Sequence, residues 1–416
     1  MTRSQSPTAW ERNQWVTTAM VFVVFMGFAF VIPFLPLYVR ELGIEDTEKA
    51  TLWAGVLIGI APLLAGLLAP GWGRLADRYG QKPMAIRALA ATALFLFLSA
   101  FVRNVEQLLA CRVATGLFGG IGPLGLAMAT SAAPREHTGR AVGLIQAAQI
   151  LAAAVGPLLG GLLADRLGRR ATFAFTSLLC LTALVLVVRF YEEGPRETRS
   201  STGKPPSLSL LGVVRTVGVP SLLGLLFLVN FVGRAITPIL PSHLERLGVR
   251  VDRLASSTGL LISAYAVMAA VSAALLGRAA RNHSPQRLLV ASLLAGAATA
   301  LPMARVSSFS TFLILAGLLG LASGGALTLC YTMGGLRVPP EHRSTAFGFF
   351  SMAALFGGAV SPSVAAAVAA RGDLIDVYKV NAVLFVIAAL ALLPGALRGD
   401  GQKPPGPVRD DSATTT

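Results

Sequence analysis

The chain has 416 residues, of which 54% are hydrophobic and only 13% charged, with a mean hydropathy of +0.67. Soluble domains carry about 25% charged residues, so this composition cannot cover a water-soluble surface. A net charge of +15 would suggest nucleic acid for a soluble protein, but here the basic residues lie in short loops between apolar runs. The composition therefore predicts an all-α integral membrane protein whose partner is the lipid bilayer and not nucleic acid.

Neither a metal nor a cofactor is expected. Cys111, Cys180 and Cys330 lie far apart within apolar segments, which is neither a disulfide framework nor a metal-ligand spacing. No phosphate-binding loop or cofactor fingerprint appears. A membrane enzyme would need a ligand cluster or a nucleophile–base pair within the spans, and no His, Asp or Glu lies there, so an enzyme is not predicted.

Apolar runs long enough to cross a hydrocarbon core, about 20 residues each, recur along the whole chain. The first begins at Trp15, is too long for a signal peptide and lacks a cleavage site, so it is the first predicted span. The twelve predicted spans cover residues 15–38, 52–73, 84–102, 107–130, 141–163, 171–188, 221–243, 255–276, 288–304, 311–335, 344–369 and 378–397.

The longest interior loop, residues 189–220, is rich in Glu, Arg, Ser and Pro and separates two groups of six spans. With both termini in the cytoplasm, 21 of the 35 Lys and Arg residues lie on the cytoplasmic side and 12 lie outside. Cytoplasmic loops carry an excess of Lys and Arg, so this orientation is predicted. The predicted parts are a cytoplasmic N-terminal tail (1–14), a six-helix bundle (15–188), a cytoplasmic linker (189–220), a second six-helix bundle (221–397) and a cytoplasmic C-terminal tail (398–416).

The two bundles are related by an internal repeat at a constant offset of 205 residues. Ile32 to Pro36 recurs as Thr237 to Pro241, Gly119-Gly120 as Gly324-Gly325, and Pro157 as Pro362. Because each repeat contains six helices, both enter and leave the membrane on the same side. Such parallel repeats place a substrate cavity at their interface near the midplane.

A charged segment follows the second span. Its glycines are expected to form a tight turn, and its single carboxylate lies among three cations, where it can face the positive end of a neighbouring helix. An ionic latch of this kind would hold one conformation and release in another, whereas the alternative is ordinary loop charge. The candidate latch residues are Gly73, Arg74, Asp77, Arg78, Gly80 and Lys82.

The segment Gly73 to Lys82 resembles the signature of the major facilitator superfamily between helices two and three, with Gln81 in place of the usual basic residue. The resemblance implies two pseudo-symmetric six-helix bundles. It also implies alternating access, in which the two halves rock about a central cavity.

Arg112 lies within the fourth span, four residues before Gly116. An arginine within a span costs about 2.5–3.5 kcal/mol on insertion scales, and so indicates a functional site by default. The alternative is an arginine that extends to the nearby membrane surface. The pairing with Gly116 resembles the superfamily's helix-four motif, which implies a role for Arg112 in proton coupling.

The fifth span contains small residues at helical spacing and an interior proline. Glycines four apart allow another helix to approach closely, and the proline removes a backbone hydrogen bond. The pattern resembles the antiporter signature of the twelve-helix drug:proton antiporter branch. The end of the first span, Phe34 to Tyr38, resembles bacterial multidrug exporters of that branch. The antiporter-motif residues are Gly143, Gly156, Pro157, Gly160 and Gly161.

The sequence departs from that branch in its ionisable residues. Proton-coupled multidrug exporters commonly use a carboxylate within the membrane, because burial raises its pKa into a useful range. Here all 20 carboxylates lie outside the predicted spans, and the four histidines lie in loops or at helix ends. The charges predicted to be buried are those of Arg112 and Arg234, which disfavours permanently cationic substrates.

Neutral or anionic amphipathic substrates are therefore predicted. Arg234 lies near the middle of the seventh span and is a candidate cavity residue, the alternative being a structural partner of backbone carbonyls. The candidate hydrogen-bonding groups are Asn230, Gln146 and Gln149. The candidate apolar walls are Phe34, Tyr38, Phe231, Tyr265 and Phe349, with ordinary packing or lipid contact as the alternative.

The leading functional prediction is a secondary active transporter of the bacterial inner membrane that exports small compounds by proton antiport, as a monomer. A sugar or organic-acid carrier or facilitator of the same fold is the closest alternative. A non-transporting membrane scaffold or sensor is weaker, because the two-fold repeat and kinked helices exceed what a scaffold needs.

Overall fold

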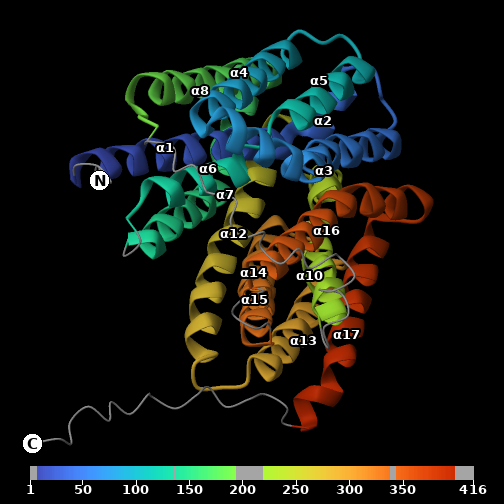
Figure 1. Cartoon of the computed structure of the whole chain (residues 1–416). Coiled ribbons are helices and arrows are strands. Elements are labelled where there is room, and N and C mark those ends of the chain that lie inside the picture. Colours follow the sequence, from blue (N-terminus) through green and yellow to red (C-terminus); the bar gives the residue numbers. More distant parts are fainter. Residues whose placement is uncertain (1–6, 135–136, 194–218, 338–342, 399–416) are drawn as a thin grey trace, which may run out of the picture.

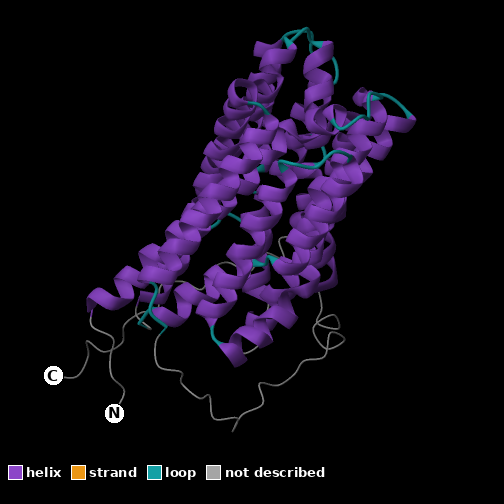
Figure 2. Cartoon of the chain, turned by 90° about the horizontal axis from the view of Figure 1, so that it is seen from above, coloured by secondary structure: helices purple, strands orange, loops and turns teal. Residues whose placement is uncertain are grey.

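The computed structural model describes residues 7–134, 137–193, 219–337 and 343–398. Within these residues the regular structure is entirely helical (Figure 2). Eleven helical segments are long and apolar enough to cross a membrane. Residues 1–6, 194–218 and 399–416 of the predicted tails and linker lie outside the described residues. Residues 7–14 of the predicted N-terminal tail belong to α1, so the first helix begins earlier than the hydropathy pattern indicated.

The first half opens with a segmented first span, α1 (Pro7–Val31), η1 (Ile32–Phe34) and α2 (Leu35–Glu41). The rest of this half consists of α3 (Thr47–Tyr79), α4 (Gln81–Ser99), α5 (Val105–Phe118), α6 (Ile121–Ala132), α7 (Thr138–Leu167) and α8 (Arg169–Phe190).

The second half repeats this order. Its first span is again segmented, into α10 (Val219–Arg234), η3 (Thr237–Ile239) and α11 (Leu240–Arg246). It continues with η4 (Val251–Arg253), α12 (Leu254–Ala279), α13 (Pro285–Met303), α14 (Phe309–Ser323), α15 (Ala326–Arg337), α16 (Arg343–Arg371) and α17 (Leu374–Arg398).

The twelfth crossing is the predicted fourth span, which is interrupted. It divides into α5 and α6 at Gly119-Gly120, and Gly120 has a φ of +93°, which favours glycine. The tenth span divides at Gly324-Gly325, between α14 and α15. The glycine pair repeated at the 205-residue offset therefore marks the same helix interruption in each half.

The repeated prolines lie at equivalent points in the first span of each half. Pro33 and Pro238 lie within the 3₁₀ turns η1 and η3, and Pro36 and Pro241 lie in the first turns of α2 and α11. Proline cannot donate to the helical hydrogen-bond ladder but is tolerated where a helix begins. Each half thus changes helix type at the same place in its first span.

The halves meet through two pairs of long helices (Figure 1): α7 packs against α12, and α3 against α16. An even number of crossings places the start of α1 and the end of α17 on one side of the membrane. We call this the terminal side, and the opposite side, where α2 is followed by α3, the far side.

The helix pairs approach so closely that glycine is required at the contacts. A Cβ atom on Gly55 would lie 2.5 Å from the carbonyl oxygen of Pro362, and one on Gly59 would overlap the carbonyl of Ala359. A Cβ on Gly259 would lie 2.7 Å from the carbonyl carbon of Pro157. Backbone therefore packs against backbone between the halves, as small residues permit in membranes.

Substituting Gly59 by Ala should force the halves apart. Overpacking a tight contact costs about 1–3 kcal/mol, so Gly59→Ala should raise at least fivefold the labelling rate of a cysteine at Ser242 by a membrane-impermeant maleimide. Ser242 is 8% exposed on the far side.

The matched control is Gly224→Ala, because nothing lies within 4 Å of a Cβ at that position. It should leave labelling unchanged. Equal labelling in both variants would contradict the proposed steric requirement at Gly59. The native cysteines, two of them buried, set the background.

Candidate functional site

Two polar contacts join the halves on the far side. Arg40 of α2 forms an ion pair with Glu245 of α11 at 2.5 Å, and the hydroxyl oxygens of Thr51 and Ser242 lie 3.5 Å apart. Arg40 and Glu245 are separated by the repeat offset of 205 residues. The ion pair therefore links equivalent positions of the two halves with opposite charges.

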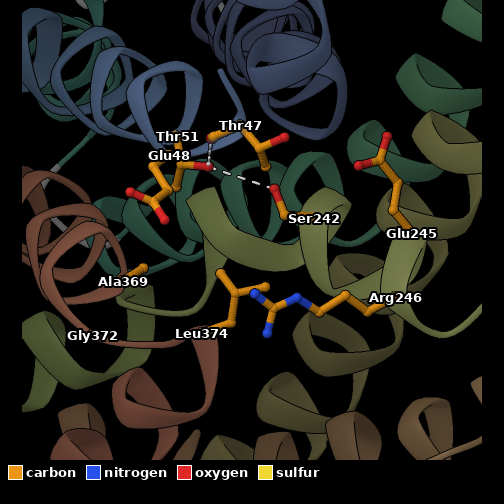
Figure 3. Close-up of a pocket in the computed structure, with 9 residues that line it drawn as sticks. All are labelled: Thr47, Glu48, Thr51, Ser242, Glu245, Arg246, Ala369, Gly372 and Leu374. Atoms are coloured by element: carbon orange, nitrogen blue, oxygen red, sulfur yellow. Dashed lines mark hydrogen bonds between the residues drawn. The ribbon is translucent and has the colours of Figure 1, made fainter. Parts of the chain in front are cut away.

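A pocket of about 410 Å³ opens beside these contacts (Figure 3). It carries the carboxylates of Glu48 and Glu245 and the guanidinium of Arg246. Arg246 also donates to Asp373, and this hydrogen bond holds the pKa of Asp373 below its ordinary value. The remaining lining residues are Thr47, Thr51, Ser242, Ala369, Gly372 and Leu374.

A third far-side contact caps a helix of the other half. The carboxylate of Asp165, near the end of α7, accepts hydrogen bonds from the backbone N–H groups of Ser256 at 2.7 Å and Ala255 at 3.3 Å. These N–H groups belong to the first turn of α12 and have no intrahelical partner. The positive end of the helix dipole also favours the carboxylate, so Asp165 stabilises the closed far side.

The sequence around Asp165 repeats the predicted latch segment at an offset of 88 residues. Asp165-Arg166-Leu167-Gly168 corresponds to Asp77-Arg78-Tyr79-Gly80, with Leu-Ala before each. Both glycines adopt nearly the same backbone, φ +87° ψ 156° and φ +102° ψ 157°, between two helices. Comparison within one half would have found Asp165, whereas comparison between halves missed it.

The predicted latch segment is helical and not a loop. Residues 73–79 form the last turns of α3, and only Gly80 turns the chain. The prediction of a loop was wrong because the turn needs one positive-φ glycine and no more. The backbone N–H of Gln81 donates to Glu193 at 2.6 Å, and Lys82 donates to the Tyr191 carbonyl at 2.6 Å. The side chain of Asp77 is outside what the structure describes.

The small residues of α7 face two neighbours. A Cβ on Gly156 would lie 2.6 Å from that of Ala29, and Gly160 lies against the backbone of Phe30, so both glycines face α1. Gly161 and Pro157 instead face α12 of the other half, whereas nothing lies within 4 Å of a Cβ at Gly143. Thus α7 joins its own half to the second half.

Arg112 lies in the interior of the first half and does not extend to the surface. It is 6% exposed, and its guanidinium carbon lies 5.8 Å from the ring centroid of Phe173. Its Nε is buried without a hydrogen-bond partner among the described residues. Burial excludes the membrane-surface alternative in this conformation.

Arg87 is a third arginine within a helix and falls inside the predicted span 84–102, but it was not predicted as a buried charge. It lies in α4 with its guanidinium carbon 3.4 Å from the ring centroid of Trp72. Arg87 donates to the carbonyl of Gly119 at 3.3 Å, and the Trp72 indole donates to that of Leu117 at 2.9 Å. The two side chains therefore satisfy carbonyls left free where α5 ends.

Arg234, at the end of α10, meets residues of two other helices. A Cβ on Gly358 of α16 would lie 3.1 Å from its Cδ, and a Cβ on the adjacent Gly233 would lie 3.5 Å from the Tyr265 hydroxyl of α12. Part of its side-chain surface is accessible, although its guanidinium lies deep among these helices. Neither Arg234 nor Arg112 forms an ion pair among the described residues.

The polar cavity candidates differ in their surroundings. Asn230 is half-buried and donates to the carbonyl of Leu226 in its own helix. Gln146 is exposed and Gln149 is half-buried. Their amides are available for a ligand to different degrees, with Gln146 the most accessible.

The aromatic candidates divide into core and accessible residues. Phe34 and Tyr38 are fully buried against Phe173 in the first half, and the Tyr38 hydroxyl donates to the Ser99 carbonyl. Their assignment as cavity walls is wrong for this conformation, because the helix turns them toward α8. The half-buried candidates are Phe231, which stacks on Phe227, together with Tyr265 and Phe349.

Removing the Asp165 carboxylate should weaken far-side closure. Loss of a cap and of its charge on a helix dipole costs about 1 kcal/mol. We expect Asp165→Ala to slow disulfide formation between cysteines placed at Thr51 and Ser242 about fivefold. Asp165→Asn should slow it about half as much. Arg166→Ala in the same turn is the control, and a rate for Asp165→Ala equal to that control argues against the cap.

The chain matches the family model of the Major Facilitator Superfamily over residues 17–257 and 251–414. It is 32% identical over 392 residues to the multidrug resistance protein MdtG of Dickeya zeae, covering 92% of this chain and 94% of that protein. MdtG of Yersinia enterocolitica is also 32% identical, over 394 residues and 94% of each chain.

Solved structures share the fold. A bacterial homolog of the human lysosomal transporter Spinster, in an inward-facing conformation, superposes with a TM-score of 0.78 at 16% identity, covering 96% of this chain and 100% of that one. The human organic anion transporter MFSD10 superposes with a TM-score of 0.67 at 19% identity, covering 93% and 100%. The chain therefore belongs to the major facilitator superfamily, a superfamily of multi-pass membrane transporters and not of enzymes.

Proposed function

We propose that this protein is a secondary active transporter that exports small amphipathic compounds from the cytoplasm in exchange for protons. The observation that carries this proposal is the 32% identity, along more than nine-tenths of both chains, to proteins named for multidrug resistance. The backbone contacts between halves support alternating access, because they are confined to interfaces that can separate without breaking either bundle.

We propose that the substrates are neutral or anionic. Arg234 supports this, because it is exposed between α10, α12 and α16 and no carboxylate pairs with it among the described residues. An arginine without a counterion attracts anions and repels cations. Tyr265, Asn230 and Gln146 complete the proposed substrate site with hydrogen-bonding groups.

The orientation is part of the proposal. Both termini lie in the cytoplasm of a bacterial cell, as the excess of Lys and Arg on that side favours. The terminal side is then cytoplasmic, and the far-side contacts close the protein to the outside in an inward-open state. The same proposal includes a monomeric protein, a latch around Asp77 and a role for Arg112 in proton coupling. It also includes the division of the chain by a linker at residues 189–220.

Replacing Arg234 tests the substrate class. In cells loaded with sulforhodamine B, an anionic dye, Arg234→Ala should reduce export about tenfold, which corresponds to ~1.4 kcal/mol of lost binding free energy. Arg234→Lys should retain most of the export because it keeps the charge. Ethidium, a cation, should leave no slower from the Arg234→Ala cells than from wild type.

The control is Arg305→Ala, an exposed arginine at a loop, which should leave the export of both dyes unchanged. Membrane levels of each variant are compared by immunoblot. Unchanged export of both dyes by Arg234→Ala would remove the charge argument, and loss of both would indicate a structural role. Wild-type cells that retain both dyes as firmly as cells lacking the protein would argue against export.

A further inference from the structure

Three buried polar groups in the second half have no hydrogen-bond partner among the described residues: His243 Nδ1, the Tyr378 hydroxyl and Asn381 Oδ1. His243, on α11, is 6% exposed, and Tyr378 and Asn381, on α17, are 0% and 1% exposed. Leaving such a group unsatisfied costs about 1–3 kcal/mol. Three such groups on two helices of one half therefore call for an explanation.

The imidazole of His243 is held by aromatic rings from two other helices. It stacks on Phe312 of α14 with centroids 4.7 Å apart and planes at 1°. Tyr378 meets the imidazole edge-on at 5.3 Å and Phe312 at 6.2 Å. The histidine expected at a helix end is thus inside the bundle, at the point where α11, α14 and α17 meet.

The equivalent position in the first half shows which residues suffice when only packing is required. At the repeat offset of 205 residues, His243 corresponds to Tyr38 and Tyr378 to Phe173. Tyr38 and Phe173 also pack together, at 5.2 Å, but the Tyr38 hydroxyl donates to the Ser99 carbonyl at 2.9 Å. The second half replaces a satisfied aromatic pair by an ionisable imidazole beside a hydroxyl without a partner.

His243 lines neither of two nearby pockets, but residues on either side of it along α11 line both. Its neighbours along α11, including Ser242 and Arg246, line the far-side pocket of about 410 Å³. Toward the membrane interior, a cavity of about 50 Å³ is lined mostly by apolar side chains, with the polar side chains of Thr237, Tyr265 and Ser323 among them. A cavity of this volume has room for water, and its three polar side chains offer hydrogen-bond partners.

The inner cavity leads toward the proposed substrate site. Phe385, one helical turn beyond Asn381, lines it, and so does Tyr265, whose hydroxyl lies beside Gly233 next to Arg234. Tyr265 therefore connects the inner cavity with the surroundings of Arg234.

The charged groups around His243 nearly balance. Arg246, one turn along the same helix, is paired with Asp373 at the turn before α17. On α17, Asp376 is paired with Lys379 at 2.9 Å, and Tyr378 is neutral at ordinary pH. Glu245, also on α11, is paired with Arg40. Helix α14 carries no ionisable side chain, and α12, which packs against α11, carries Tyr265 and, in its last turn, Arg278. No unbalanced charge from these elements therefore fixes the imidazole in one protonation state.

We propose that His243 is the proton-binding site of the transport cycle, which rests on the proton antiport proposed above. Nδ1 takes up one proton through the far-side pocket when the far side opens, forming an imidazolium. It returns that proton through the inner cavity when the terminal side opens, leaving the neutral imidazole. Histidine is the side chain whose charge ordinarily changes between pH 5 and 8.

The test uses purified protein in liposomes with sulforhodamine B as the probe. Wild type should accumulate dye when a pH gradient is imposed. His243→Gln should reduce this accumulation at least tenfold, while the rate of dye movement down its own gradient stays within twofold of wild type. Tyr378→Phe should show a smaller loss. The matched control is His283→Gln, because His283 is exposed at the α12–α13 turn.

Accumulation by His243→Gln at the wild-type level would overturn the role of His243 and leave proton antiport standing. Wild-type dye movement that ignores the pH gradient would instead overturn proton antiport itself, and the role of His243 with it. Loss of downhill movement in His243→Gln, with its thermal unfolding unchanged, would identify a different role.

A second measurement needs no transported dye. In ¹⁵N-histidine-labelled protein in nanodiscs, the signal missing from His243→Gln assigns the His243 ring. That ring should change from neutral to protonated between pH 8 and 5. A ring that stays neutral down to pH 4.5 would overturn the proposal.

Discussion

The close approach of helix backbones between the halves is the constraint on which the other features depend. Where Gly59 meets Ala359 and Gly259 meets Pro157, a single Cβ atom would have no room. Such interfaces gain dispersion contacts but no hydrophobic driving force, because lipid is as apolar as the side chains it replaces. The halves are therefore joined by shape and by a few polar contacts.

Those polar contacts follow from what a bilayer does not tolerate. Free backbone groups at helix ends and interruptions must find partners within the protein. Arg87 and Trp72 supply them where α5 ends, and Asp165 supplies them to α12 of the other half. The contacts of Arg87 and Trp72 lie within one half, whereas the Asp165 contact joins the two halves on the far side. In the proposed alternating access, this backbone contact of Asp165 closes the far side when it forms and opens it when it breaks.

The spans, the two-fold repeat and the family signature could be predicted from the sequence, because apolar length and repeated glycines and prolines act locally. The side chains that face the interface could not. Within a span, residues facing lipid and residues facing the core are equally apolar, so Phe34 and Tyr38 gave no sign of being buried against Phe173. Arg87 was hidden by its position near a helix end, and the burial of His243 by the short helix after η3.

The most direct test of the account measures both gates at once. Spin labels at Lys49 and Arg250 report on the far side, and labels at Tyr79 and Arg281 report on the terminal side; all four positions are exposed. When acidic pH or added dye shifts the population, the account predicts that the far-side distance lengthens while the terminal-side distance shortens. Distances that lengthen together, or a far-side distance that changes alone, would contradict alternating access between rigid halves.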